Sequence, residues 1–363
     1  MKRIMVTGAG GSPATGFVRS LRDAPEPYYL IGVDVDPYNL QRAQTDECHL
    51  VPRVTDPDYL PIMLDIISQT RPHLLHVQIS SEMVALSKLR GALPCTTFLP
   101  RHATVVTCDD KFASYDCWSR AGLVVPETVM LNEPADLAEA FERFGPRLWL
   151  RFTVGSAGRG ALGASDLREA RLWVDSHGGW GHFTAARWLD PHTVTWQSIW
   201  RNGELIVAQG RKRLYWEFAN RAPSGVTGIT GTGVTVRDPV VDQIAQRAVK
   251  AIDPTPMGIF GVDLTYDRDG VPNPTEINVG RFFTTHQFFT AAGLNMPYIF
   301  VKSALGETLP YIARTLNPLE PGLAWVRGMD VEPILTTERR IAEARNDLMR
   351  RRARVLMPRA MGA

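Results

Sequence analysis

The chain has 363 residues, of which 44% are hydrophobic and 21% are charged, as is typical of a globular protein with more than one domain. A formal net charge of +2, from 40 Lys and Arg against 38 Asp and Glu, gives no reason to expect nucleic acid or an anionic membrane as the main partner. The four cysteines form no CxxC pair and no apolar run is long enough to span a bilayer, so we expect a cytoplasmic protein.

Residues 1–103 alternate strands and helices. "RIMVTGAGGSPATGFVRSLR" runs from an apolar strand through glycines into a helix, and the strands "YLIGVDVD" and "HLLHVQIS" follow with a helix between them. This order predicts a Rossmann-like parallel sheet. The glycines, with Asp34 at the end of the second strand, resemble a dinucleotide site, so an NAD-linked oxidoreductase is one hypothesis; any tight turn from strand to helix also favours glycine.

Residues 104–185 read as a small α/β domain. "TCDDKFASYDCWSRAGL" begins with acids that suit a helix N-terminus, and the strand "RLWLRF" leads through the glycine loop "VGSAGRGALG" into the helix "DLREARLWVD". The loop lacks the Lys-Ser/Thr ending of a P-loop. It is either a lid whose backbone amides close on a triphosphate or a flexible connector.

Residues 186–310 predict antiparallel hairpins, from the strands "TVTWQSIW", "ELIVAQGRKRLYW" and "GIFGVDLTYD", followed by an apolar helix around "PYIFVKSALG". The tryptophans of these strands could face an aromatic substrate, but alternating strand tryptophans more often belong to a core. Residues 311–363 end in an Arg-rich segment that we expect to form a helical tail.

One hairpin has the composition of a metal site. If "GVDLTY" and "PTEIN" pair around a turn at residues 268 and 269, Asp263 lies opposite Pro274 and shares a face with Glu276 and Asn278. Diagonal neighbours in such a pair are about 7–8 Å apart, so the side chains could share a cation. Oxygen ligands of this kind suit Mg²⁺, and an exposed acidic hairpin face is the alternative.

Two cations precede this hairpin in the chain. Lys111 stands at a predicted helix start and Arg151 stands on the strand before the glycine loop. Either residue alone is more typical of a solvated surface charge. A nucleotide site needs fixed cations against its phosphates. The order of Lys111, Arg151, the glycine loop and the acidic hairpin along the chain is what favours such a site.

The order of these features, with "CDDK", "LRFTVGSAGRG", "ARWL", "GVD" and "EIN" followed by an arginine, resembles the ATP-grasp superfamily. The similarity is greatest to the branch of carbamoyl-phosphate-synthetase-like carboxylate–amine ligases, and it runs from residue 1 to about residue 310. It implies a mixed α/β and α+β fold, in which a Rossmann-like pre-ATP-grasp domain (1–103) precedes a small lobe with the lid (104–185) and a large lobe with the metal site (186–310). In that family the first domain usually holds no NAD, and ATP lies between the two lobes.

The resemblance also implies roles for single residues. Lys111 and Arg151 would contact the ATP phosphates, Trp188 and Leu189 would line the adenine pocket, and Arg281 would steady the transferred phosphoryl group. The lid residues that would close on the phosphates are Gly155, Ser156, Gly158 and Gly160. The residues that would hold Mg²⁺, with Mn²⁺ left open, are Asp263, Glu276 and Asn278. Arg211 and Arg213 are candidates to face the substrate carboxylate.

The implied reaction joins a small-molecule carboxylate to an amine through an acyl phosphate, at the cost of ATP, and a homodimer is left open. The sequence departs from the family at Pro191, His192 and Gln197, where a glycine and acids are usual. Arg281 also follows Asn278 by three residues instead of two. A nucleotide-binding protein without turnover is therefore a third hypothesis.

Overall fold

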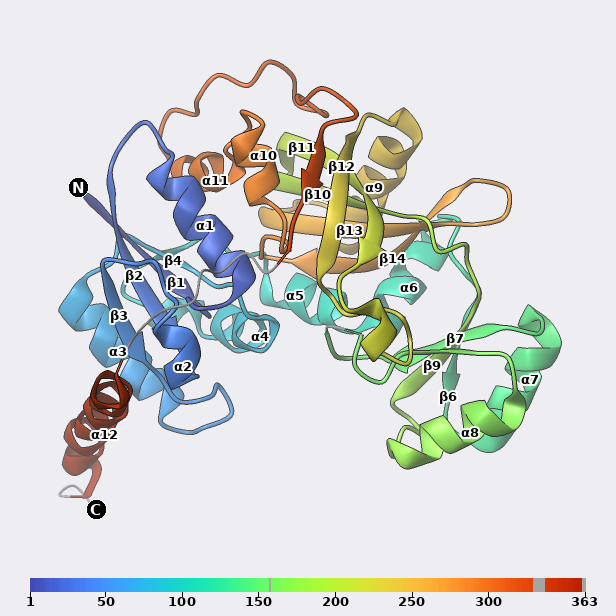
Figure 1. Cartoon of the computed structure of the whole chain (residues 1–363), viewed down its shortest axis with the longest axis horizontal. Helices are drawn as coiled ribbons and strands as arrows, with labels where there is room; N and C mark the ends of the chain where they lie inside the picture. Colours follow the sequence, from blue (N-terminus) through green and yellow to red (C-terminus); the bar gives the residue numbers. More distant parts are fainter. Residues whose placement is uncertain (157, 329–336, 361–363) are drawn as a thin grey trace.

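The computed structural model describes residues 1–156, 158–328 and 337–360, and its strands form three sheets (Figure 1). The first sheet has the order β3-β2-β1-β4-β5, and every pair in it is parallel. Its strands are β1 (Lys2–Thr7), β2 (Tyr28–Asp34), β3 (Glu47–Leu50), β4 (Leu74–His76) and β5 (Thr96–Thr97). Its helices are α1 (Ser12–Arg22), α2 (Pro37–Leu40), α3 (Tyr59–Thr70) and α4 (Ser80–Lys88), with a 3₁₀ turn at Arg90–Ala92. The predicted parallel sheet is confirmed.

The second sheet is small and antiparallel, with the order β6-β9-β7-β8. Its elements are β6 (Thr128–Leu131), α7 (Pro134–Phe144), β7 (Leu148–Phe152), β8 (Leu162–Ala164), α8 (Leu167–Ser176) and β9 (Phe183–Arg187). Leu131, Leu150 and Phe183 belong to a buried cluster that is separate from the other cores. This lobe, at the lower right of Figure 1, therefore has a core of its own.

The third sheet has the order β14-β13-β10-β11-β12-β15, all antiparallel. Its strands are β10 (Thr193–Arg201), β11 (Glu204–Trp216), β12 (Thr230–Val236), β13 (Gly258–Tyr266), β14 (Pro272–Val279) and β15 (Ala324–Val326). A 3₁₀ turn at Ala219–Arg221 and the helices α9 (Pro239–Ile252), α10 (Gln287–Ala291) and α11 (Met296–Ala304) accompany it. The structure differs from the expected helical tail over 311–363, because β15 comes from this stretch and pairs with β12.

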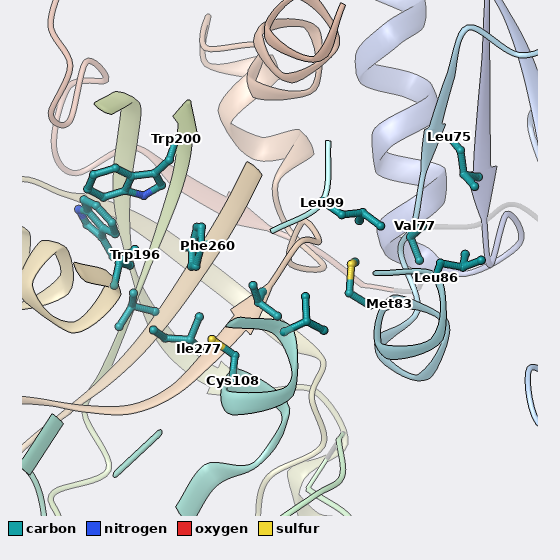
Figure 2. Packing of buried hydrophobic residues seen from close by; sticks show 14 of the residues in the cluster. Leu75, Val77, Met83, Leu86, Leu99, Cys108, Trp196, Trp200, Phe260 and Ile277 are labelled. Carbon is teal, nitrogen blue, oxygen red and sulfur yellow. The ribbon is translucent and has the colours of Figure 1, made fainter. Parts of the chain in front are cut away.

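One hydrophobic core joins the first and third sheets. Figure 2 shows Val77 and Met83 of the first domain, Cys108 of α5 (His102–Asp109), and Ile277 and Phe260 of the third sheet in the same cluster. The next helix, α6 (Lys111–Arg120), packs on α9 and β14, and its Trp118 donates a hydrogen bond to the carbonyl of Ala248 (3.0 Å). Residues 102–120 therefore pack on the large sheet, and α6 also contacts β6 of the small one. The domain boundaries at 103, 185 and 310 stay predictions.

The last helix, α12 (Glu338–Ala360), lies against α3 and β3 at the lower left of Figure 1. Arg351 is buried there and pairs with Asp65 of α3 (3.0 Å), and Arg352 pairs with Asp58 (3.3 Å). The arginines of the tail thus bind the first domain. Within the described ranges, no helix combines the length and the apolar character needed to cross a membrane.

Candidate active site

A row of polar residues crosses four neighbouring strands of the large sheet. Arg211 on β11 pairs with Thr195 on β10, which pairs with Asp263 on β13, which pairs with Glu276 on β14. Residues directly opposite one another in antiparallel strands point to the same face. The hydroxyl of Thr195 donates to Asp263 Oδ1 (2.6 Å), and Asn278 Nδ2 donates to Asp263 Oδ2 (2.9 Å). The three expected metal ligands, Asp263, Glu276 and Asn278, therefore share one face of the sheet.

The expected register within this hairpin is wrong by a bulge. Asp263 lies opposite Glu276, and Leu264 lies opposite Pro274, so Thr275 is an extra residue in β14. Pro274 has no N–H for the ladder, which favours such an irregularity. The bulge frees the carbonyl of Thr275, which accepts a hydrogen bond from Arg151 Nη2 (2.8 Å). It thus brings the two expected acids face to face and fixes an arginine beside them.

Lys111 links the lid to the carboxylates. It is the first residue of α6, where Asp110 caps the helix by accepting from the N–H groups of Phe112 and Ala113. Its side chain is buried, its Nζ donates to the carbonyl of Gly155 (2.7 Å), and it lies 3.7 Å from Glu276 Oε1. The expected phosphate-binding lysine therefore touches both the base of the lid and the expected metal site.

Arg213 approaches the same carboxylates from β11. Its Nη2 lies 3.9 Å from Asp263 Oδ1, its Nη1 donates to the hydroxyl of Thr193 (2.9 Å), and its guanidinium stacks on Trp216 (3.4 Å). Burial lowers the pKa of Arg213 to about 10, below its ordinary value, and the charges of Asp263 and Glu276 oppose that effect. A cation held this close to two acids is placed to neutralise an anionic ligand.

Arg281 contacts the expected metal ligand Asn278, although it follows Asn278 by three residues instead of two. Gly280 before it has a φ of +70°, a left-handed conformation that glycine adopts without strain, and a Cβ there would come within 2.5 Å of Met83 Sδ. The turn directs Nη2 of Arg281 to the side-chain oxygen of Asn278, to which it donates a hydrogen bond. Gln197, one of the departures from the family, holds the next turn of this loop by accepting from the N–H of Phe283 (3.0 Å).

The donor set fits a divalent cation. Burial raises the pKa of Asp263, the charge of Glu276 raises it further, and Arg213 and Thr195 lower it. Two facing carboxylates repel each other when both are ionised, and a divalent cation between them relieves this. The described residues include no cluster of three His, Cys, Asp or Glu side chains with metal-site geometry, so Mg²⁺ would need Asn278, water or ligand oxygens to complete its shell.

A cavity of about 660 Å³ opens between the small sheet and the large one. Arg151, Arg213, Asp263 and Glu276 line one part of it. Its other walls include two expected adenine-pocket residues and three further aromatic residues, namely Trp188, Leu189, Trp149, Tyr215 and Trp216. A narrower recess beside it is lined by Lys111, Gly155, Glu276, Asn278 and Arg281. Glu276 lines both, so the narrow recess and the aromatic cavity meet at one carboxylate.

Solved structures resemble this chain over most of its length. The biotin carboxylase domain of the 2-oxoglutarate carboxylase from Hydrogenobacter thermophilus, in complex with MgADP, ADP and bicarbonate, is 15% identical, with a TM-score of 0.69 over 89% of this chain and 73% of that one. The carboxyaminoimidazole ribonucleotide synthase from Aspergillus clavatus, complexed with ATP, is 17% identical, with a TM-score of 0.66 over 88% and 80% of the two chains. An L-amino acid ligase from Bacillus licheniformis is 13% identical, with a TM-score of 0.65 over 85% and 75%.

The chain has the ATP-grasp fold. At these sequence identities the likeness establishes the fold and leaves the activity open, and no family model matches the sequence. The expected fold class, an ATP-grasp fold preceded by a Rossmann-like parallel-sheet domain, is confirmed. The roles of single residues stay predictions.

The glycine loop that is expected to act as a lid packs on a second loop. Gly158 has a φ of +68°, and a Cβ there would lie 2.4 Å from the carbonyl oxygen of Val226. Val226 belongs to the loop between β11 and β12, which also lines the large cavity. Gly160, with a φ of +72°, accepts at its carbonyl from Trp173 Nε1 (2.9 Å). The carbonyl of Ser156 accepts a hydrogen bond from the N–H of Arg159 (3.4 Å).

Sequence reasoning missed Arg147 and Trp149 as residues of the cavity. Trp149 stands on β7 two positions before Arg151, and Arg147 directly precedes that strand, four positions before Arg151, so the alternation of an extended chain puts all three on one face. The guanidinium of Arg147 lies over the Trp188 ring at 3.6 Å. The alternation of Arg147, Trp149 and Arg151 in "RLWLR" was therefore sufficient to predict that these residues share a face. His192, another departure from the family, is exposed and contacts Asp190, so it does not enter the cavity lining.

The glycine turn of the first domain is occupied by the chain itself. The N–H of Gly10 donates to Asp34 Oδ2 (3.0 Å), and the N–H of Asp36 donates to Asp34 Oδ1 (3.0 Å). A Cβ on Gly10 would come within 1.8 Å of the carbonyl oxygen of Asn39. The acid expected to bind a ribose is thus buried against backbone, which disfavours a dinucleotide site there.

Proposed function

We propose that the protein is an ATP- and Mg²⁺-dependent ligase that joins a small-molecule carboxylate to an amine. The observation that carries this proposal is the convergence of Lys111, Arg151 and Arg213 on the facing pair Asp263 and Glu276, at one end of an aromatic cleft. Fixed cations beside acids suit a phosphate chain with its metal, and the aromatic walls suit a base. The similarities to a biotin carboxylase domain crystallised with ADP and to a carboxyaminoimidazole ribonucleotide synthase crystallised with ATP agree with it.

The reaction has two steps. An oxygen of the substrate carboxylate attacks the γ-phosphorus of ATP, the bond to the β-phosphate oxygen breaks, and ADP leaves with an acyl phosphate remaining. The amine then attacks the acyl carbon, the bond from that carbon to the phosphate oxygen breaks, and the amine proton is lost as phosphate departs. Such transfers need positioning and charge neutralisation rather than a side-chain nucleophile.

The residues supply these two needs. Lys111 and Arg151 would hold the β- and γ-phosphates, and Arg213 and Arg281 would neutralise the charge that grows on the transferred group. Trp188 and Leu189 would hold the adenine, and the lid from Gly155 to Gly160 would exclude water from the acyl phosphate. Asp263, Glu276 and Asn278 would hold Mg²⁺ or Mn²⁺, which would supply positive charge to neutralise the phosphates.

The direct test is ADP release from ATP, measured across pooled carboxylates and amines with mass detection of the product. We expect ADP formation that requires a carboxylate, and a loss of about a hundredfold or more in Glu276→Gln. The matched control is Glu204→Gln, which changes an exposed glutamate at the far end of β11. A Glu276→Gln protein that turns over at the wild-type rate would disprove the metal assignment.

The rival hypotheses have distinct outcomes. NADH binding without any thermal stabilisation by Mg-ATP would favour the oxidoreductase, against the blocked glycine turn. Mg-ATP binding with no ADP from any carboxylate would favour a nucleotide-binding protein without turnover. The cytoplasmic location stays a prediction.

A further inference from the structure

A second cavity, of about 180 Å³, lies between α1, the loop after β14 and β15. Its lining includes Ser12, Thr15 and Arg19 of α1, Thr285 and Gln287 beside and within α10, and Trp325 of β15. A single water needs roughly 10–15 Å³ of such space, so the cavity can hold a group larger than a lone solvent molecule. None of the functions assigned above uses it.

The cavity favours negative charge. Among the described residues that line it, Arg19 carries a positive charge and none is an Asp or Glu; the Nε of Arg19 also donates to Gln44 Oε1 (2.9 Å). Ser12 is the first residue of α1, whose N-terminus has no side-chain cap and no acid in its first turn. The free N–H groups and the dipole at such a helix start attract anions. The described part of the chain therefore surrounds this space with donors and positive charge.

Two buried hydroxyls on the cavity wall have no protein partner. Thr15 and Thr285 are both almost completely buried, at 2% and 1% exposure, and neither Oγ1 makes a hydrogen bond within the described residues. A buried polar atom without a partner costs free energy, so such atoms usually mark a bound water or ligand. Their presence is independent of the helix terminus and also points to a polar occupant.

Hydrogen bonds connect the cavity with the proposed phosphoryl-transfer site. Arg213, beside Asp263, donates from Nε to the hydroxyl of Thr230 (3.0 Å). The carbonyl of Thr230 accepts from Arg327 Nη1 (3.5 Å), and Arg327 Nη2 donates to the hydroxyl of Ser12 (2.8 Å). A continuous series of contacts thus runs from the cavity wall at Ser12 to Arg213, one of the residues proposed to act on the transferred group.

One wall comes from outside the stretch that resembles the ATP-grasp family. Trp325 lies on β15, beyond residue 310, and stacks on Phe288 with ring centroids 5.7 Å apart and planes at 23°. The neighbouring Arg327, just after β15, supplies the bond to Ser12. The tail of this chain therefore completes the cavity, and the resemblance does not predict it.

We propose that this cavity binds the anionic group, a carboxylate or a phosphate, of the amine substrate, an inference that rests on the proposed ligase function. Arg19 and the start of α1 hold the charge, and Thr15 and Thr285 donate hydrogen bonds to its oxygens. The amine substrate is then an amino acid or an amino phosphate rather than a neutral amine.

The test is titration of the nucleotide-free full chain with succinate and with inorganic phosphate in a calorimeter. We expect saturable binding of at least one anion. Tighter binding of succinate would indicate a carboxylate group on the amine substrate, and tighter binding of phosphate would indicate a phosphate group. Arg19→Gln and Thr285→Val should each weaken it roughly tenfold, the size of a lost hydrogen bond to a charged group. Arg22→Gln, which removes another arginine of α1, exposed and paired with Asp46 outside that helix, should bind like the wild type. Binding unchanged by Arg19→Gln and Thr285→Val, or no saturable binding, overturns the proposal.

Turnover separates this inference from the proposed function. Once an amine substrate is found, Arg19→Gln should raise its KM and leave the KM for ATP unchanged. Carboxylate-dependent ADP release with unchanged kinetics in Arg19→Gln contradicts the cavity assignment alone. Anion binding that is lost in Arg19→Gln, in a protein that forms no ADP with any carboxylate, contradicts the ligase function and leaves an anion site.

Discussion

The contact between the lid and the loop after β11 gives a quantitative prediction for Gly158→Ala. The left-handed backbone at Gly158 costs a residue with a Cβ about 1–2 kcal/mol, and the new methyl group would also lie 2.4 Å from a backbone oxygen of Val226, which has little freedom to move. A loss of 1–2 kcal/mol in the closed lid corresponds to a factor of about 5–30 in its population. We therefore expect the KM for ATP to rise by at least that factor.

A matched control separates closure of the lid from backbone strain. Gly178 also has a positive φ, +55°, and lies in the same lobe, but a Cβ there meets nothing within 4 Å. Gly178→Ala should lower the stability of the lobe by a similar 1–2 kcal/mol and leave the KM for ATP unchanged. The assay is steady-state ADP release at varied ATP, with thermal unfolding of both variants. Equal KM values for Gly158→Ala and the wild type, or equal shifts in both variants, would refute the argument.

Three further predictions follow from single contacts. Trp188→Ala should raise the KM for ATP roughly tenfold or more, by loss of stacking on adenine, with kcat kept; an unchanged KM in the ADP assay would move adenine elsewhere. Arg281→Lys keeps the charge but loses the planar fork that binds Asn278, so kcat should fall roughly a hundredfold with little change in the KM for ATP, and a kcat like that of the wild type would contradict its role. Burial lowers the pKa of His286 to about 4, so as the pH falls below about 6.5 the unfolded chain binds this proton before the folded chain does. The group should therefore lower the free energy of unfolding by about 2 kcal/mol at pH 5. Between pH 6.5 and 5 the melting temperature of His286→Asn should fall less than that of the wild type, and an equal fall would contradict the argument.

Local patterns were sufficient to predict the elements that build the cleft. The apolar alternation of "RLWLRF" predicts β7, and the acids of "CDDK" predict a helix start, which the structure forms with Asp110 as the cap of α6. These features depend on neighbours within a few residues. The same alternation also contained Arg147, which a full count of the strand face would have found.

Strand register and helix packing that depend on residues distant in the sequence could not be predicted from local patterns. The bulge at Thr275 depends on how Pro274 meets Leu264 across the hairpin, and a shift of this kind changes which residue faces Asp263. The packing of α5 and α6 on the large sheet depends on Trp118 reaching Ala248, a contact between residues 130 positions apart. The strand β15 is three residues long and has no pattern of its own, so only the open edge of β12 determines it.

The measurement that tests the central claim most directly is the fate of carboxylate oxygen. A carboxylate substrate labelled with ¹⁸O is turned over with Mg-ATP and its amine, and the released phosphate is analysed by mass spectrometry. If the carboxylate attacks the γ-phosphorus and the acyl phosphate then loses phosphate to the amine, one labelled oxygen must be in each phosphate. Phosphate that carries no label, released while ADP is formed, would contradict the account.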